Sequence, residues 1–249
     1  LVLPDGSATF LRLYNDMFVH PMEAEIAAAL KRLIMKVPKV ACLTGHGERD
    51  MNNVGDRDYY AFAKNPTFRN ALINQGFQVR DLTLTQPVPA DVDVLVISDM
   101  KVPFTPEEFV NYSSFVDKGG NLIILGEVKR QKNMNPIVGI LGLRFADGIL
   151  VAPSKQYLDD VIAARITEGA LKASPYFAQL IQRGYTIITP SACAVEIIDS
   201  TKGFEISEVL ATNSQGSWIE YETTDFINEK STINDKIGED TAKKKKIEH

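Results

Sequence analysis

Cysteine and tryptophan are scarce in this sequence, and long apolar runs are absent. Its 249 residues include two cysteines, Cys42 and Cys193, and one tryptophan, Trp218. A chain of this length buries about 70 to 75 % of its unfolded surface, so folding requires no disulfide or metal ion. No stretch approaches the roughly 18 consecutive apolar residues of a transmembrane helix, and the first residues lack the basic-then-apolar pattern of a signal peptide. Because the sequence starts at Leu1 rather than Met, we expect a processed or excised piece of a longer protein.

Positive charge is also in short supply. The formal net charge of −5 provides no general positive field for nucleic acid or for an anionic membrane surface. The basic residues 243–246 lie in a polar terminal stretch, where a solvated tail is favoured over a lipid contact because no apolar span adjoins them. Two cysteines decide neither the redox compartment nor whether Cys42 and Cys193 pair. Apolar residues make up 45 % of the chain, a share typical of globular domains.

Three short apolar runs predict the strands of a parallel sheet. They are rich in β-branched residues and lack polar alternation, which is typical of parallel strands covered on both faces. A fourth run, residues 77–84, alternates like a strand. The three apolar runs are residues 39–44 (KVACLT), 93–98 (DVLVIS) and 121–126 (NLIILG).

Helical segments with explicit ends separate these runs. Thr105 and Glu108 form a capping box around Pro106, which predicts a helix ended by the glycines at 119–120. Asn65 and the following proline predict a second helix over residues 66–75. The alternation of strands and helices predicts an α/β fold with a doubly wound, mostly parallel sheet.

The segments outside this core have weaker patterns. Residues 8–14 suggest a strand, and residues 22–36 predict a helix with its apolar side packed on the sheet. That side would comprise Ile26, Leu30, Leu33 and Val37. In the second half we expect strands at residues 144–152, 185–189, 195–198 and 208–212 and a helix at 169–184 interrupted at Ser174-Pro175.

We expect three regions along the chain. Residues 1–36 would pack on the sheet of an α/β domain over residues 37–226, with a weak boundary near residue 153. Residues 227–249 would form a polar tail.

Loops at the carboxyl ends of the strands are the predicted functional region. Ligands of open parallel sheets bind there, at the point where the strand order reverses. Glycines in the first loop would let the backbone turn sharply and approach a ligand. The expected ligand-binding residues are Gly45, His46, Gly47, Glu48, Asp99 and Glu127; Arg49, Lys101 and Lys129 add charge to the same loops.

Three interpretations of the loop at residues 45–50 (GHGERD) remain open. His46, Glu48 and Asp50 alternate, so on an extended segment they would share a face and ligate a metal with help from Asp99 or Glu127, but no metal motif supports this. His46 with Glu48 forms a possible acid and base pair. The loop otherwise binds a small polar ligand, a sugar or a partner protein, or simply makes a sharp turn.

Catalysis lacks a recognisable nucleophile. The chain has no G-x-S-x-G or G-x-C-x-G elbow, and Cys193 lacks the strand-turn-helix context of one. We therefore predict no catalytic residues, no cofactor and no metal. Trp218 is expected to pack at the rim of the core. A carbohydrate-binding module would need exposed aromatics, for which Tyr59, Tyr60 and Phe62 are the candidates.

The chain resembles the auxiliary components of bacterial ABC-type transport systems, the family that includes a gliding-motility transport protein. The likeness runs from about residue 23 to 221, and the strand followed by GHGE is its most specific element. Its other motifs are residues 25–34 (EIAAALKRLI), 76–80 (GFQVR), 89–97 (PADVDVLVI), 119–122 (GGNL), 135–136 (NP), 141–143 (LGL), 147–148 (DG), 212–214 (TNS) and 217–220 (SWIE).

This resemblance implies a flavodoxin-like fold similar to class I glutamine amidotransferases, without catalysis. It implies a domain on the extracytoplasmic, periplasmic face of the cytoplasmic membrane, anchored by helices outside this sequence. The implied partners are the permease and ATPase subunits of the transporter. An amidotransferase-like hydrolase using His46 and Glu48 is the rival hypothesis. If the loop is a functional surface, replacing these two residues by alanine should change stability by no more than about 0.5 kcal/mol.

Overall fold

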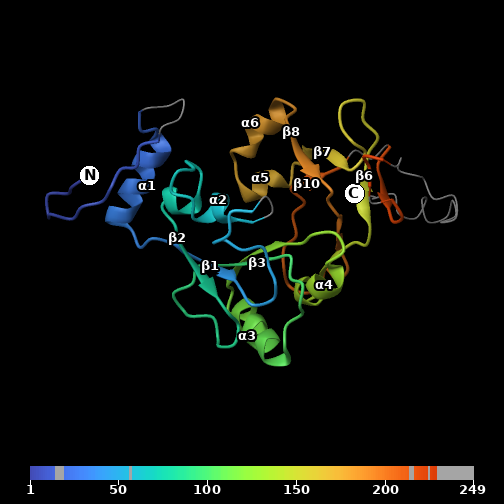
Figure 1. Ribbon diagram of the computed structural model, residues 1–249, viewed down its shortest axis with the longest axis horizontal. Coiled ribbons are helices and arrows are strands. Elements are labelled where there is room, and N and C mark those ends of the chain that lie inside the picture. The colour runs from blue at the N-terminus through green and yellow to red at the C-terminus, as the bar shows by residue number, and fades with distance from the viewer. Residues whose placement is uncertain (15–19, 56–57, 213–215, 224, 229–249) are drawn as a thin grey trace. The chain divides into compact units, whose positions relative to one another are not determined.

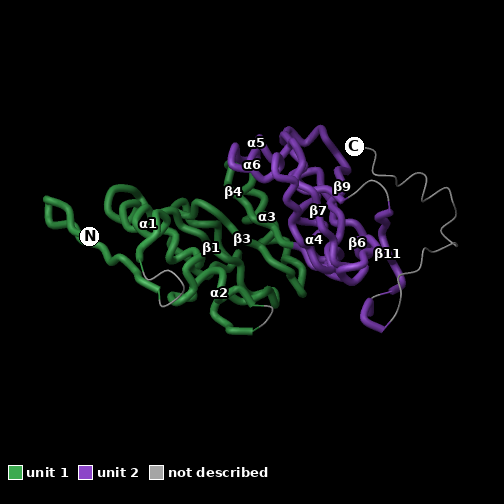
Figure 2. Tube along the Cα trace, turned by 90° about the horizontal axis from the view of Figure 1, so that it is seen from above, with its two compact units in different colours: residues 1–125 green, residues 126–249 purple. Residues whose placement is uncertain are grey.

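The computed structural model describes residues 1–14, 20–55, 58–212, 216–223 and 225–228 (Figure 1). The chain divides into two compact units, Leu1–Leu125 and Gly126–His249 (Figure 2). This division falls at the end of a strand, inside the segment expected to form one α/β domain. The domain limits expected at residues 36 and 226, and the weak boundary near 153, stay predictions. The basic residues 243–246 lie outside the described residues.

A four-stranded parallel sheet forms the centre of the first unit. Its strands are β1 (Lys39–Leu43), β2 (Gln78–Leu82), β3 (Val94–Ser98) and β4 (Asn121–Leu125), so all four strands predicted between residues 39 and 126 are confirmed. They lie in the order β2-β1-β3-β4. Val40 of β1 pairs with Val79 on one side and Val94 on the other. Since the chain moves outward in opposite directions from β1, the strand order reverses between β1 and β3, which defines the switch point of the sheet.

The two central strands carry the core. β1 and β3 each have four buried residues of five, and Val40, Cys42 and Val96 pack with Met51 and Ala63. β4 differs, because its residues alternate between exposed and half-buried. The expected burial on both faces is therefore wrong for β4. As an edge strand it has one neighbour only, and the elements that cover the central strands leave one of its faces exposed.

Helix α3 (Pro106–Asp117) begins as its sequence predicts. The Thr105 hydroxyl accepts a hydrogen bond from the Glu108 backbone N–H at 3.3 Å, and the Glu108 carboxylate accepts one from the Thr105 N–H at 2.9 Å. This is a complete capping box. Glu108, Tyr112 and Val116, spaced four residues apart, form the buried side of the helix.

Helix α1 (Glu23–Ile34) is confirmed, but its predicted buried side is wrong for Ile26 and Leu30, while Leu33 and Val37 are half-buried. Glu25, Ala28 and Ala29 are buried, whereas Ile26 and Leu30 are exposed. Two contacts explain the orientation. The Glu25 carboxylate pairs with the Arg69 guanidinium at 2.7 Å, and a Cβ at Gly76 would lie 3.4 Å from the Ala28 backbone, so the small residues allow close packing. The strand suggested at residues 8–14 does not form there; Ala8 only makes an isolated bridge to Val2.

The helix predicted over residues 66–75 is wrong. The segment consists of turns and a short 3-10 helix, η1 (Leu72–Asn74), and a short helix α2 (Tyr60–Ala63) precedes it. The Asn65 side chain accepts hydrogen bonds from the Thr67 N–H and hydroxyl. The Asn74 amide donates to the Asn65 and Phe68 carbonyls. Side chains of this kind compete with the helical ladder for backbone partners, which explains the turns.

The second unit is antiparallel, so the mostly parallel sheet describes the first unit alone. β7 (Val161–Ile166) lies between β10 (Leu210–Ala211) and β8 (Thr186–Pro190). β5 (Leu143–Phe145) pairs with β9 (Val195–Ile197), and β6 (Ile149–Val151) pairs with β11 (Trp218–Glu220). Its helices are α4 (Gln131–Gly139), α5 (Ala170–Ala173) and α6 (Phe177–Gln182).

Several predictions for this unit are confirmed in shortened form. β8, β9 and β10 lie within or beside the predicted runs, and the helix at 169–184 is interrupted at Ser174-Pro175 as expected. The single strand expected at 144–152 is two strands, β5 and β6, and β7, β11 and α4 were not predicted. Trp218 packs half-buried against the cluster of Ile149, Val151 and Phe226, at the rim of the core. Within the described ranges, no helix is long and apolar enough to cross a membrane.

Candidate functional site

The loops that follow β1 and β3 are joined at the switch point of the sheet. The His46 carbonyl accepts hydrogen bonds from the backbone N–H groups of Lys101 and Val102, at 2.8 and 3.1 Å. The Arg49 guanidinium forms an ion pair with the buried Asp99 carboxylate. These contacts bring together two segments about 50 residues apart in sequence. Of the three loops predicted to share one edge of the sheet, those at residues 45–50 and 99–102 are thus joined, whereas the placement of the loop at residues 127–130 stays a prediction.

The His46 side chain is buried between two carboxylates. Its Nδ1 lies 3.2 Å from a Glu48 oxygen, and its Nε2 lies 3.1 Å from a Glu108 oxygen. The Phe104 ring packs edge-on against the imidazole with a centroid separation of 5.1 Å. The His46 side chain is only 6 % exposed and the Glu48 side chain 4 %. Both ring nitrogens thus have partners inside the protein.

Each of the two carboxylates also holds a backbone group. Glu48 accepts a hydrogen bond from the His46 N–H at 2.7 Å, while Glu108 caps the first turn of α3 through Thr105. The Glu48–His46–Glu108 cluster, as we call these three side chains, therefore connects the loop after β1 to the start of α3. Charge-assisted hydrogen bonds of this kind are about twice as strong as neutral ones, so the cluster fixes the loop rather than leaving it free.

The environment of Glu108 shifts its ionisation. Burial raises the pKa of the Glu108 carboxyl, but hydrogen bonds from the Thr105 backbone and from the His46 ring outweigh this effect, so its pKa lies below the ordinary value of 4.5.

This shift predicts acid sensitivity of the first unit. Because the folded-state pKa is below the unfolded one, ionised Glu108 contributes stability above about pH 4.5, and this contribution disappears as pH falls through the folded-state pKa. A Glu108→Gln variant should be less stable than the parent protein at neutral pH and should lose less stability between neutral and acid pH. Urea unfolding at a series of pH values measures both quantities. Glu107→Gln, at the exposed neighbouring position, serves as the control and should keep the parent pH profile; parallel curves for the parent and Glu108→Gln would contradict the assignment.

The glycines of the loop are required by its backbone. Gly45 has φ 115° and Gly47 has φ 71°, the region in which residues with a Cβ are strained. A Cβ at Gly47 would also lie 3.2 Å from the Lys101 side chain. Both glycines are exposed, as are Lys101 and Val102. We call these four residues, Gly45, Gly47, Lys101 and Val102, the switch-point surface.

The expected ligand-binding residues thus fall into three groups. Gly45 and Gly47 face outward, whereas His46, Glu48 and Asp99 lie inside and position the loop. Glu127 belongs to the second unit, as does Lys129. Sequence reasoning missed Glu108 as part of the site, since the capping box already explained it. The only available signal was that the helix start it caps follows the β3 loop by a few residues.

Metal binding and thiol chemistry receive no support from this geometry. Among the residues that the structure describes, no three His, Cys, Asp or Glu side chains are placed to hold a metal ion. Asp50 accepts hydrogen bonds from the Asn52 N–H and amide instead. Burial, with a smaller effect of Asp81, raises the pKa of the Cys42 thiol to about 12, so this thiol stays protonated in the core. Neither Cys42 nor Cys193 takes part in a disulfide.

The aromatic residues after the loop are divided between core and surface. Tyr59 packs against the core cluster around Cys42, and its ring lies 5.7 Å from the Arg49 guanidinium. Phe62 is exposed and its ring centroid lies 6.3 Å from that of Tyr59. Tyr60 is half-buried. They do not form an exposed aromatic platform, and carbohydrate binding stays a prediction.

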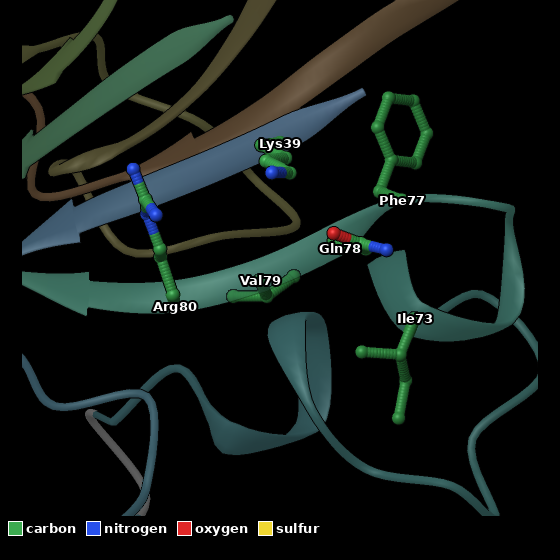
Figure 3. Close-up of a pocket in the computed structure, with 6 residues that line it drawn as sticks. All are labelled: Lys39, Ile73, Phe77, Gln78, Val79 and Arg80. Atoms are coloured by element: carbon green, nitrogen blue, oxygen red, sulfur yellow. The ribbon is translucent and has the colours of Figure 1, made fainter. Parts of the chain in front are cut away.

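A cavity of about 420 Å³ lies at the opposite end of the strands (Figure 3). It is next to the first residues of β1 and β2. In this view Ile73 of η1 lies on the side of β2 that is away from β1. Its two cations share one partner: Lys39 and Arg80 bind the two oxygens of Asp91 at 2.5 and 2.9 Å. These hydrogen bonds lower the pKa of Asp91 to about 2. The lining residues are Lys39, Ile73, Phe77, Gln78, Val79 and Arg80.

Fold and site together define a parallel-sheet α/β domain with a charge-anchored loop at its switch point. Residues 37–148 match the family model described as "ABC-type uncharacterized transport system". Over these residues the match confirms the resemblance to auxiliary components of ABC-type transport systems that was drawn from the motifs. It contains the whole parallel sheet and both switch-point loops.

Among solved structures, one shows a likeness of fold at a TM-score of 0.50. The mmIFT52 N-terminal domain is 13 % identical with a TM-score of 0.50, and the match covers 76 % of this chain and 81 % of that chain. The exo-beta-1,4-mannosidase Op5Man5 from Opitutaceae bacterium strain TAV5 is 15 % identical with a TM-score of 0.33, covering 70 % of this chain and 33 % of that chain. These identities carry no functional conclusion. No curated protein matches the chain.

Proposed function

We propose that this chain is a non-enzymatic domain of an ABC-type transport auxiliary subunit and that it binds a partner protein through the switch-point surface. The observation that carries this proposal is that the loops contain buried charged residues, which fix the backbone, and exposed residues, which are available for contact. Buried charges of the Glu48–His46–Glu108 cluster and the Arg49–Asp99 pair hold the exposed residues in place. A surface fixed before binding loses little conformational entropy when a partner docks.

The exposed groups favour a protein over a small ligand. They combine the bare backbone of two glycines, the ammonium group of Lys101 and the residue Val102, which is 54 % exposed. Small ligands usually bind in concave, mostly apolar sites, and the cavity described above lies at the other end of the strands. The proposed partners are the permease and ATPase subunits of the transporter, by the family match.

The same geometry argues against the rival amidotransferase-like hydrolase. A general base must reach the proton that it removes, whereas both His46 nitrogens are held by carboxylates. Cys42 lies inside β1 with a protonated thiol, so it is not positioned as a nucleophile.

The finer family assignment is part of this proposal. The order β2-β1-β3-β4 corresponds to the first four strands of the flavodoxin-like order, which supports a flavodoxin-like or class I glutamine amidotransferase-like fold. We place the domain on the extracytoplasmic face of the cytoplasmic membrane, held by segments outside this sequence, in a gliding-motility-like system. Labelling of intact cells with a membrane-impermeant amine reagent tests the location: an unlabelled domain would rule it out.

Substitutions on the switch-point surface test the binding role. We expect Lys101→Glu/Val102→Glu to reduce recovery of the permease and ATPase about tenfold or more when the full-length protein is cross-linked in native membranes and purified, because charge reversal at an interface strongly disfavours contact. Val110→Glu on α3 is the matched control, since Val110 is 60 % exposed and faces away from the core. Equal recovery with both variants would exclude this surface as the docking site.

A further inference from the structure

Helix α1 presents an apolar stripe to solvent. Ile26, Leu30 and Ile34 are 40, 40 and 66 % exposed and follow one another at intervals of four residues, so they lie along one face. The opposite face holds the helix to the first unit through Glu25, Ala28 and Ala29. The apolar face of this amphipathic helix therefore points away from the protein that carries it.

We propose that a second copy of this chain covers the stripe, with the two α1 helices packed antiparallel across a two-fold axis at Leu30. In this arrangement Ile26 of each copy faces Ile34 of the other, and the two Leu30 side chains meet at the axis. Such an interface is self-complementary, as a two-fold contact must be. The small residue Ala27, exposed beside the stripe, lets the helices approach to the usual 8–10 Å.

Charge at the two ends of the stripe selects this partner. Glu23 lies three residues before Ile26 on the same face, and Lys36 follows the helix at its other end; both are exposed. Neither forms an ion pair with another described residue. An antiparallel copy brings Glu23 close to Lys36 at both ends of the contact, and the antiparallel helix dipoles add to the attraction.

A lipid surface fits the same stripe less well. Membrane-surface helices carry cations around the apolar face, because the cytoplasmic leaflet and many other bilayers are anionic. Here a carboxylate, Glu23, stands at the head of the stripe, where an anionic surface would repel it. The acidic start and basic end match a helix of reversed direction instead.

Sedimentation equilibrium of the whole chain tests the association. The parent protein should form a concentration-dependent dimer, and Leu30→Glu should abolish it by placing two carboxylates at the axis. Because Leu30 is exposed, this variant should unfold at the same temperature as the parent protein at concentrations where the parent is monomeric. Val110→Glu, which adds the same charge at another exposed apolar position, should still dimerise. A parent protein that stays monomeric at all concentrations, or a dimer that survives Leu30→Glu, overturns the proposal.

A charge exchange tests the antiparallel register. Glu23→Lys and Lys36→Glu should each weaken dimerisation about tenfold, since each places like charges together twice. The double variant Glu23→Lys/Lys36→Glu should restore it. If the double variant is no tighter than either single one, the pairing is wrong.

Cross-linking provides a second, geometric test. In a Cys193→Ser background, Leu30→Cys should form an intermolecular disulfide on mild oxidation, because the two positions meet at the axis. Ile34→Cys should not, since its two copies lie four residues on either side of the axis and thus about 12 Å apart at 1.5 Å per residue. Disulfides need Cα atoms within about 7 Å. Equal cross-linking at both positions would exclude the antiparallel arrangement.

Discussion

Replacing His46 by alanine is expected to destabilise the first unit by about 3 kcal/mol. The imidazole lies between the Glu48 and Glu108 carboxylates, and its removal leaves two buried acidic side chains facing each other across a void. Removing one hydrogen-bond partner so that a buried polar group is left unsatisfied costs about 1 to 3 kcal/mol, and here two carboxylates each lose a partner. Urea unfolding followed by far-UV circular dichroism measures the loss, and hydrogen exchange should locate it in the loop after β1 and the first turn of α3.

Lys101→Ala is the matched control for this substitution. Lys101 belongs to the same pair of loops but is exposed, so its truncation should change stability by no more than about 0.5 kcal/mol. A neutral result for His46→Ala would show that the cluster adds nothing to stability. The loop would then be the freely substitutable surface that the sequence first suggested.

Gly142→Ala is expected to destabilise the second unit by about 3 kcal/mol or more. Gly142 has φ 79°, and its added Cβ would lie 2.0 Å from the Asp199 carbonyl oxygen. A left-handed residue with a Cβ costs about 1 to 2 kcal/mol and overpacking about 1 to 3 kcal/mol. The clash is with backbone, and the Gly142 carbonyl also accepts the N–H groups of Ile198 and Asp199, so β9 itself would have to move.

Gly203→Ala is the control that separates the cost of backbone strain at positive φ from the cost of the steric clash with Asp199. Gly203 has φ 82° but nothing within 4 Å of the added Cβ, so its substitution should cost only about 1 kcal/mol. Trp218, the sole tryptophan, packs on the core of the second unit, and its fluorescence during urea unfolding reports both variants. Equal decreases in the free energy of unfolding for Gly142→Ala and Gly203→Ala would show that β9 can move away from the added Cβ without destabilising the unit.

The parallel strands and α3 were predictable because their signals are local. The apolar runs of β1 and β3 and the capping box at Thr105 need no knowledge of distant residues. The orientation of α1 was not predictable in the same way. Apolar periodicity finds the amphipathic side, but Glu25 turned inward because a partner, Arg69, stands 44 positions further along the chain.

The site was predictable in position but not in composition. The strand-end rule placed the loops after β1 and β3 at one edge, and the backbone bonds from Lys101 and Val102 to His46 confirm it. The rule cannot say which charges turn inward. His46 contacts Glu108, which lies 62 residues further along the chain. Nothing in the sequence assigned the Glu108 carboxylate to the loop, because the capping box already accounted for it. Ligand binding by the six expected residues stays a prediction.

The double attachment of Glu108 limits how this loop can be transferred to another protein. One of its oxygens binds both the Thr105 N–H and the His46 ring, so this single side chain stabilises both the start of α3 and the loop after β1. A graft of residues 45–50 onto a foreign parallel sheet would carry the glycines, His46 and Glu48, but not the second carboxylate, Glu108. An engineer would have to move the first turn of α3 with the loop, because the transferable module is a loop and a helix start that are far apart in sequence.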